Sequence, residues 1–434
     1  IIQGRWRLSA GNQALIFQPD ESYIQGELIE VTIDERLKDG KLFFRDEINL
    51  SFQTTGLSGM EHKNLCEQVS NNRLSSVINS GKQRAASDSA VIFPTSDTLP
   101  DDYNQFWISY WDDPSPGYIF FVPLDYTEWV YYLTIVDNYG TPVFYRETKQ
   151  GGMDFKLHPE RNMLTWWDSH SNAFLGMNER FQVVDTFTMG NGYSTDLHEL
   201  LLLENGNYWC LGYDPQLVAM DTVVTGGHPD ATVIGLIVQE LDSLGNVIFQ
   251  WRSWDHFQIT DCHDWGHITD SIVDYVHGNS IALDSDTSVL ISCRNMNEIT
   301  KIDRRTGEII WRWNGKNDQF TWIDDDIKFH VQHHIRRMEN GHLSLFDNGH
   351  TFSSAAEYEI DEEGMTATLV NRIRRFPDAH GVIMGNAQRL ENGYTICGWG
   401  SDPVGVTEFD NDNNMRLDIM IPDLNYRAFK FNWE

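Results

Sequence analysis

Three histidines occupy equivalent places in a repeated pattern of this sequence. His198, His277 and His333 are each followed, about seven residues later, by a tight polar turn and then an apolar strand. Arg294 stands one strand after His277. An imidazole can donate a hydrogen bond, transfer a proton or attack as a nucleophile, and a guanidinium offers a planar fork to oxyanions. These residue types together indicate a site for an anion.

Two other interpretations of these residues are open. Three histidines also form a catalytic zinc set, but an arginine among them disfavours a dication, so we predict neither a metal nor a cofactor. Alternatively, polar residues at repeat positions only cap hairpins or tie neighbouring repeats together. That explanation suits any single histidine better than it suits three histidines with an arginine.

Two further segments contain metal-binding residue types. Asp261–His267 has an irregular setting and is interpreted as an exposed loop. Asp410–Asn414 lacks the glycine and terminal glutamate of an EF-hand, so it is interpreted as a hairpin turn.

Residues this far apart in sequence need a repeating architecture to bring them together. One repeated unit is an acidic turn before a β-branched or aromatic strand; it begins at Asp137, Asp242, Asp303 and Asp361. Asp can bond its own backbone and Gly tolerates positive φ, as hairpin turns require. Short strands, recurring hairpins and a repeat of tens of residues predict a β-propeller. With about 40–50 residues per blade, we expect six blades.

The register of the repeats also predicts where function lies. Inner strands of all blades converge on the central channel, so polar residues at one offset fall on equivalent parts of successive blades. His198, His277, His333 and the region of Asn386 are therefore expected to meet in one pocket.

The fold class is thus all-β: a six-bladed β-propeller with a small N-terminal β-sandwich-like domain. Residues 1–90 contain short strand-like runs and form the accessory domain. Residues 91–116 are predicted to be a linker, and residues 117–434 the catalytic propeller.

Composition excludes several classes of protein. The 434 residues carry 32 Lys+Arg against 64 Asp+Glu, a formal charge of −32, which argues against binding nucleic acid or an anionic membrane surface. No apolar run approaches the ~20 residues of a membrane span. The five cysteines are scattered, and Cys293 is interpreted as a buried small hydrophobe. Distant carboxylates are largely screened beyond ~8 Å, so an acidic body is compatible with a positive pocket.

Several strings of this chain are similar to those of the bacterial aryl-sulfate sulfotransferase family. The resemblance runs over most of the chain and includes Thr195-Asp-Leu-His198-Glu, His277-Gly-Asn279, Ser292-Cys-Arg294, Gln332-His333, Leu345-Phe-Asp-Asn-Gly349 and Met384-Gly-Asn386. The combination is specific, although any one string is weak.

This resemblance implies a periplasmic or secreted enzyme that transfers a sulfuryl group from an aryl sulfate to a phenol without PAPS, by a ping-pong mechanism. It implies that His333 is the nucleophile and forms a sulfohistidine. Arg294, His277, His198 and the substrate-binding Asn279 are implied to hold the sulfuryl oxygens, with one imidazole handling the phenol proton. His334 is expected to point the other way and to be structural.

Two alternatives remain open from the residues. One is a polysaccharide lyase acting on uronate-containing or sulfated glycans, in which Arg294 neutralises a carboxylate and a histidine or Tyr275 removes the C5 proton. The other is a non-catalytic propeller that binds acidic ligands. The expected partners are therefore an aryl sulfate and a phenol, or an acidic glycan; the sequence gives neither the natural donor and acceptor nor the oligomeric state.

Overall fold

The computed structural model describes four N-terminal strands and residues 99–433 apart from 126–129, 149–150, 264–265 and 286. The chain divides into two units, Ile1–Gly81 and Lys82–Glu434. In the first unit, β1 (Gly4–Leu8) pairs with β2 (Leu15–Pro19), and β3 (Leu28–Ile33) pairs with β4 (Ile48–Gln53).

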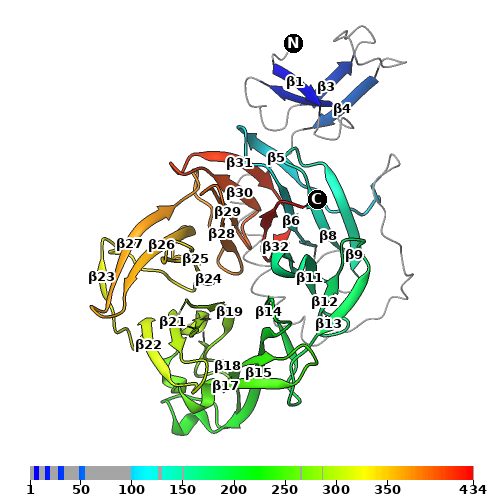
Figure 1. Ribbon diagram of the computed structural model, residues 1–434. Coiled ribbons are helices and arrows are strands. Elements are labelled where there is room, and N and C mark those ends of the chain that lie inside the picture. Colours follow the sequence, from blue (N-terminus) through cyan, green and yellow to red (C-terminus); the bar gives the residue numbers. More distant parts are fainter. Residues whose placement is uncertain are drawn as a thin grey trace. The chain divides into compact units, whose positions relative to one another are not determined.

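The second unit is a six-bladed β-propeller, as predicted (Figure 1). Blade 1 consists of β6 (Tyr118–Phe121), β7 (Pro123–Asp125), β8 (Val130–Val136), β9 (Pro142–Thr148), β32 (Leu424–Asn425) and β33 (Phe429–Phe431). Blade 2 consists of β10 (Gly152–His158), β11 (Met163–Asp168), β12 (Ala173–Met177) and β13 (Val183–Phe187). Blade 3 consists of β14 (Thr195–Leu202), β15 (Tyr208–Val218), β16 (Ala231–Leu241), β17 (Val247–Arg252) and β18 (Ile272–Asp274).

Blades 4 to 6 complete the ring. Blade 4 consists of β19 (Gly278–Leu283), β20 (Val289–Cys293), β21 (Glu298–Ile302) and β22 (Ile309–Asn314). Blade 5 consists of β23 (Thr321–Ile323), β24 (His333–Arg337), β25 (Leu343–Asp347), β26 (Ser354–Asp361) and β27 (Thr366–Ile373). Blade 6 consists of β28 (Asn386–Arg389), β29 (Thr395–Gly398), β30 (Val406–Phe409), β31 (Met415–Met420) and β5 (Trp107–Trp111). Short 3-10 turns are η1 (Pro159–Arg161), η2 (Met220–Thr222), η3 (Ser253–Asp255), η4 (Ile259–Asp261) and η6 (Arg294–Met296).

The acidic turns form the hairpins that the sequence predicts. In the turn between β16 and β17, Asp242 Oδ1 accepts hydrogen bonds from the backbone N–H groups of Leu244 and Asn246, both at 2.9 Å, and Gly245 adopts φ +80°. Asp410 Oδ1 likewise accepts from Asp412 and Asn414 between β30 and β31, which confirms the hairpin interpretation of that segment.

The hydrophobic core is divided among the contacts between blades. The described residues form six apolar clusters, one between each pair of neighbouring blades. Trp209, Trp251, Trp313 and Trp399 are fully buried in these clusters. Cys293 is also fully buried, as predicted, and burial raises the pKa of its thiol. Each inner strand is therefore held between two apolar interfaces, which fixes the side chains that it presents to the channel.

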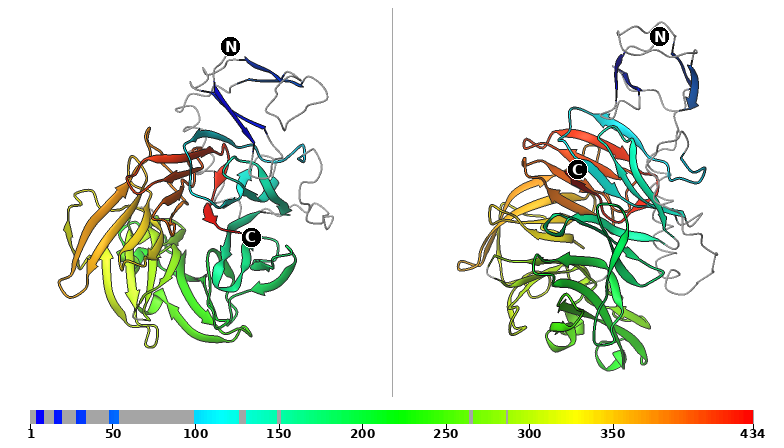
Figure 2. Two further views of the ribbon diagram at one scale, coloured as in Figure 1. Left: turned by 45° about the horizontal axis from the view of Figure 1, so that its top comes forward. Right: turned by 45° about the vertical axis from the view of Figure 1, so that its right-hand side comes forward.

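Residues near the C-terminus close the ring. β33 pairs with β6 and β32 pairs with β7, so the end of the chain supplies part of blade 1; the red terminal segment lies beside the cyan strands in both views of Figure 2. Blade 6 receives β5, which pairs with β31.

β5 corrects one prediction. Residues 91–116 are predicted to be a linker, but Trp107–Trp111 is the outer strand of blade 6, and the boundary between the two units falls after Gly81 rather than near residue 90. The prolines on both sides of β5 give this region the composition of a loop, and they hide a strand whose partner is some 300 residues away in sequence.

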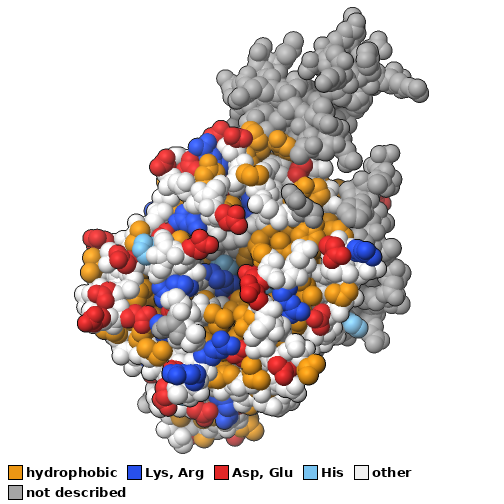
Figure 3. Space-filling view, viewed as in Figure 1, with side chains coloured by type: hydrophobic (Ala, Val, Ile, Leu, Met, Phe, Trp, Pro, Cys, Tyr) orange, Lys and Arg blue, Asp and Glu red, His pale blue; other side chains and the backbone are white. Residues whose placement is uncertain are grey.

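Acidic and basic side chains are interspersed over the face seen in Figure 3, and Lys and Arg gather toward its middle. No helix in the described part of the chain is long and apolar enough to cross a membrane.

Candidate active site

The inner strands bring four of the predicted residues to one end of the channel. His198 lies in β14, His333 is the first residue of β24, and His277 directly precedes β19 with φ +50°. Arg294 begins η6 directly after β20, and its backbone N–H donates to the carbonyl of His277 at 3.0 Å. His277, Arg294 and His333 therefore stand at the ends of strands, whereas His198 lies within β14.

These side chains lie close together, and all but the partly exposed His277 are buried. The rings of His198 and His277 meet edge to face with centroids 5.0 Å apart. His333 is 2% exposed and Arg294 6% exposed. Burial lowers the pKa of His333 most, and Arg294, His198 and His277 lower it further, so all four groups share one electrostatic environment.

A neutral amide holds the imidazole of His333. Its Nδ1 lies 2.8 Å from Asn348 Oδ1 and 3.2 Å from the carbonyl of Val331. Both neighbours are acceptors, so Nδ1 carries the proton and Nε2 has the lone pair. Asn348 is itself fixed by donating to the carbonyls of Gly381 and Met384 at 2.6 and 2.9 Å.

Burial and the neighbouring cation keep His333 neutral. Desolvation lowers its pKa most, followed by the charge of Arg294, and together they place the pKa well below the ordinary value of 6.5. A neutral imidazole with its lone pair on Nε2 is the form that attacks an electrophile.

Carboxylates hold the other two histidines. His198 Nδ1 lies 2.5 Å from Asp196 Oδ2, and His277 Nδ1 lies 2.7 Å from Asp274 Oδ2. Burial lowers the pKa of His277, and the carboxylate of Asp274 opposes that shift. Each carboxylate orients its ring through Nδ1, and an imidazole so held can act as a general acid or base.

Arg294 supplies the positive charge of the site. Its guanidinium donates to Asn295 Oδ1 at 2.9 Å and to the carbonyl of Val382 at 3.2 Å. Burial lowers its pKa to about 10, so it stays cationic at neutral pH. Its charge also acts on His330. The pKa of His330 is lowered to about 4 by burial, by the stacked His350 and by Arg294.

Three residues have contacts that the sequence did not predict. Asn279 is fully buried and donates from Nδ2 to the carbonyl of Gln332 at 2.7 Å, so it fixes the backbone in front of His333; its substrate-binding role stays a prediction. Asn386 uses both amide groups on the backbone of Ala428, rather than facing the pocket. Tyr275 is buried against Ser253 at 2.8 Å, so its hydroxyl is not placed to act as a base in this site.

His334 lies apart from His333. Its Nδ1 lies 3.0 Å from the carbonyl of Ala387, and its ring packs against Phe429 with centroids 5.6 Å apart. The side chains of His333 and His334 thus point in opposite directions, as we expect for adjacent residues of a strand.

Sequence reasoning gave no role to four residues that hold the site: Asn348, Asp196, Asp274 and Tyr426. The first three lie in or next to the family-like segments quoted from the sequence. A hydrogen-bond acceptor in these segments could therefore have been predicted to hold each histidine. Tyr426 packs its ring 5.7 Å from that of His198 and donates to the His198 carbonyl at 3.2 Å. It has no such signal, because only ring closure brings it there.

The arrangement can bind and attack an anion. Three imidazoles are fixed through Nδ1, which leaves their Nε2 atoms for a ligand beside the Arg294 guanidinium. Among the described residues, no group of three or more His, Cys, Asp or Glu is arranged to hold a metal ion.

Comparison with known proteins identifies the family. The family model described as Arylsulfotransferase (ASST) matches residues 160–421. The chain belongs to the arylsulfotransferase family. This confirms the resemblance predicted from the sequence, and the family supports sulfuryl transfer in general. The matched range contains the four clustered residues and Asn348, but not Tyr426.

Solved structures match this chain at low sequence identity and with TM-scores below 0.5. A protein of unknown function from Bacteroides caccae matches with a TM-score of 0.47 and 12% identity, over 73% of this chain and 99% of its own. The periplasmic gluconolactonase of Pseudomonas aeruginosa matches with 0.46 and 8%, over 74% and 100%. Virginiamycin B lyase of Staphylococcus aureus matches with 0.36 and 10%, over 73% and 88%. No curated protein matches this sequence.

Proposed function

We propose that this arylsulfotransferase-family protein transfers a sulfuryl group from an aryl sulfate to a phenol through a sulfohistidine on His333. The observation that carries the proposal is the difference among the three histidines. His333 is held by a neutral amide beside a cation, whereas His198 and His277 are held by carboxylates.

In the first half-reaction, Nε2 of His333 attacks sulfur as the bond from sulfur to the aryl oxygen breaks. Arg294 neutralises charge on the sulfuryl oxygens, and His198 or His277 gives a proton to the departing phenolate. Preorganised donors of this kind commonly contribute several kcal/mol of barrier reduction. Buried cations also disfavour protonation of His333, which keeps its lone pair available.

In the second half-reaction, an acceptor phenol loses its proton to the same imidazole and attacks sulfur. The bond from sulfur to Nε2 breaks and neutral His333 returns. No nucleotide donor takes part in this cycle, so we expect independence from PAPS. We also propose that the protein acts outside the cytoplasm, as a secreted or periplasmic enzyme, because the family resemblance implies this.

The direct test uses p-nitrophenyl sulfate. We expect p-nitrophenol release without PAPS and faster release when an acceptor phenol is added. When no acceptor phenol is present, intact mass spectrometry should show one added SO₃ group on the protein. His333→Ala should lower the rate by about 10³-fold or more and prevent the mass change. His170→Ala, at an exposed turn, is the matched control and should keep both.

Turnover without any covalent adduct, or an adduct that persists in His333→Ala, contradicts the assignment of the nucleophile. Absence of turnover with aryl sulfates, together with new absorbance near 235 nm on acidic glycans, replaces the transferase by the lyase. Binding without turnover in either assay leaves a non-catalytic propeller.

A further inference from the structure

A cavity is lined by residues that follow the histidine site along the inner strands β14 and β24. It has a volume of about 660 Å³, within the range of small-molecule sites. Inner strands order the residues along the channel. In β14, His198 is followed by Glu199 and then by Leu201 and Leu202, which line the cavity. In β24, His333 is likewise followed by Arg336, which lines it. The cavity is therefore distinct from the histidine site.

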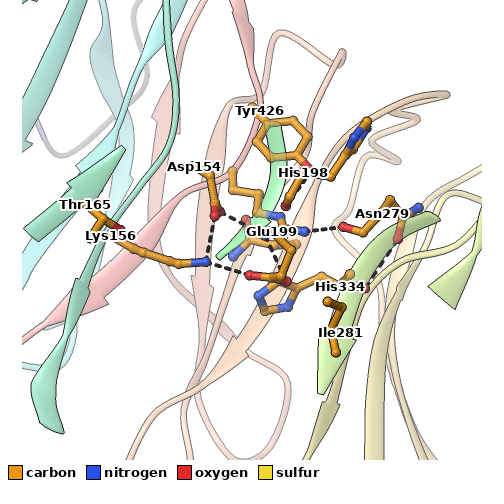
Figure 4. A network of polar contacts seen from close by, with 12 residues as sticks. Asp154, Lys156, Thr165, His198, Glu199, Asn279, Ile281, His334 and Tyr426 are labelled. Carbon is orange, nitrogen blue, oxygen red and sulfur yellow. Dashed lines mark hydrogen bonds and ion pairs between the residues drawn. The ribbon is translucent and has the colours of Figure 1, made fainter. Parts of the chain in front are cut away.

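A largely buried layer of ion pairs surrounds Glu199, the residue that follows His198 in β14 (Figure 4). Lys156 Nζ lies 2.6 Å from both Asp154 and Glu199. Glu199 also pairs with Arg336 at 2.8 Å and with Arg427 at 3.3 Å, and Arg427 reaches Asp154 at 2.8 Å.

This layer carries an unbalanced charge. Its three cations are Lys156, Arg336 and Arg427, and its two anions are Asp154 and Glu199, so 3 − 2 leaves one positive charge. The neighbouring His158 and His334 add none, because burial and these cations lower the pKa of each well below its ordinary value. The three cations of the layer thus share two carboxylates.

The excess charge faces the cavity. Lys156 and Arg336 both line it, and the Arg336 side chain keeps 24% of its surface exposed. The other lining cations, Arg337 and Arg389, are already paired with Asp284 and Glu357, and the acidic Glu160, Glu339 and Glu391 of the lining are exposed.

An apolar wall lies next to the two cations. Phe429 and Phe431 line the cavity with stacked rings whose centroids are 5.9 Å apart, and Lys156 Nζ lies 5.9 Å from the Phe429 centroid. Leu201 and Leu202 extend the apolar surface. We propose that this cavity binds a small organic monoanion, with the anionic group at Lys156 and Arg336 and an apolar ring against Phe429 and Phe431.

The test uses 2-naphthoate as the probe, in calorimetric titrations of the full chain up to about 10 mM. 2-Naphthalenemethanol has the ring without the charge, and acetate has the charge without the ring. We expect 2-naphthoate to bind at least about tenfold more tightly than either, as a charge-assisted contact plus apolar burial requires.

Variants locate the site by its charge. Arg336→Gln makes the layer neutral and should weaken 2-naphthoate binding by at least about tenfold, whereas Arg336→Lys keeps the charge and most of the affinity. Glu199→Gln raises the excess to two charges and should tighten binding. Circular dichroism and thermal unfolding establish that each variant is folded.

Arg294→Gln and His333→Ala should bind the probe as wild type does, which separates this cavity from the sulfuryl-transfer site whether or not transfer occurs. The proposal is overturned if wild type does not bind 2-naphthoate. It is equally overturned if Arg336→Gln binds it as wild type does, or if Arg294→Gln abolishes binding.

Discussion

Single atoms distinguish the three histidines of the site. The Nδ1 atom of each ring is held by an acceptor, but only His333 has an uncharged partner, Asn348. The pKa values of His333 and His277 are both shifted, so pH profiles are an informative measurement of the roles of these two residues.

Arg294→Gln should move the acidic limb of the pH profile. Arg294 lowers the pKa of His333, so its removal brings that pKa up toward 6.5, and a larger fraction of the nucleophile is protonated in mildly acidic solution. We expect kcat/KM at neutral pH to fall by about 10²-fold and its acidic limb to shift to higher pH. Arg294→Lys keeps the charge and should leave the limb in place; an unmoved limb in Arg294→Gln contradicts this account.

Asp274→Asn should act on the opposite limb. The carboxylate raises the pKa of His277 against the effect of burial, so the amide leaves that pKa lower. If protonated His277 delivers the proton to the phenolate, the basic limb of kcat moves to lower pH. Poor leaving groups should suffer more than p-nitrophenolate, since they need the proton most. A loss that is equal for all leaving groups would indicate a purely structural role.

The sequence was sufficient to group the clustered histidines, because repeat register places His198, His277 and His333 on equivalent parts of three blades. It was not sufficient for Asn386, which occupies the same pattern one residue shorter but bonds the backbone of Ala428. The repeat register determines the backbone position from which a side chain projects. The partner that the side chain contacts depends on a segment from elsewhere in the chain.

Among the elements, the inner strands depend on cross-links to the closing segment. Asn386→Ala removes two buried hydrogen bonds to Ala428, at 2.7 and 2.8 Å, and leaves the backbone groups unsatisfied. We expect the free energy of unfolding to fall by about 2–4 kcal/mol, measured by denaturant unfolding. Asn371→Ala is the matched control: its amide also makes two hydrogen bonds, to Asn413, but on the surface, and should cost less than about 0.5 kcal/mol. Equal losses would refute the role of burial.

Hairpins were predictable and blade boundaries were not. The turns at Asp242 and Asp410 are encoded by side chains that bond the adjacent backbone, so a short window of sequence contains the whole cause. β5 pairs with β31, and β33 pairs with β6, across most of the chain. Their pairing results from closing the ring, which no local pattern records.

The stability of the whole molecule should fall in mild acid because of its buried neutral histidines. The pKa values of His158, His333 and His334 are well below 6.5 in the folded state. As pH falls through 6.5, the unfolded chain takes up protons that the folded protein does not, and each such histidine costs about 1.4 kcal/mol per pH unit. Unfolding measured between pH 7 and 5 should give a smaller slope for His158→Gln than for wild type. Identical slopes would show that His158 is protonated when folded.

The pairing of β33 with β6 also constrains when this protein can fold during its synthesis. Until residues 424–431 have been synthesised, blade 1 lacks its inner edge, and Tyr426 and Arg427 are missing from the channel. The nascent chain therefore holds an open β-edge on β6 while about 300 further residues emerge, and such edges recruit other chains. Folding of the propeller is thus expected to finish only once residues 424–431 have been synthesised and can pair with β7 and β6.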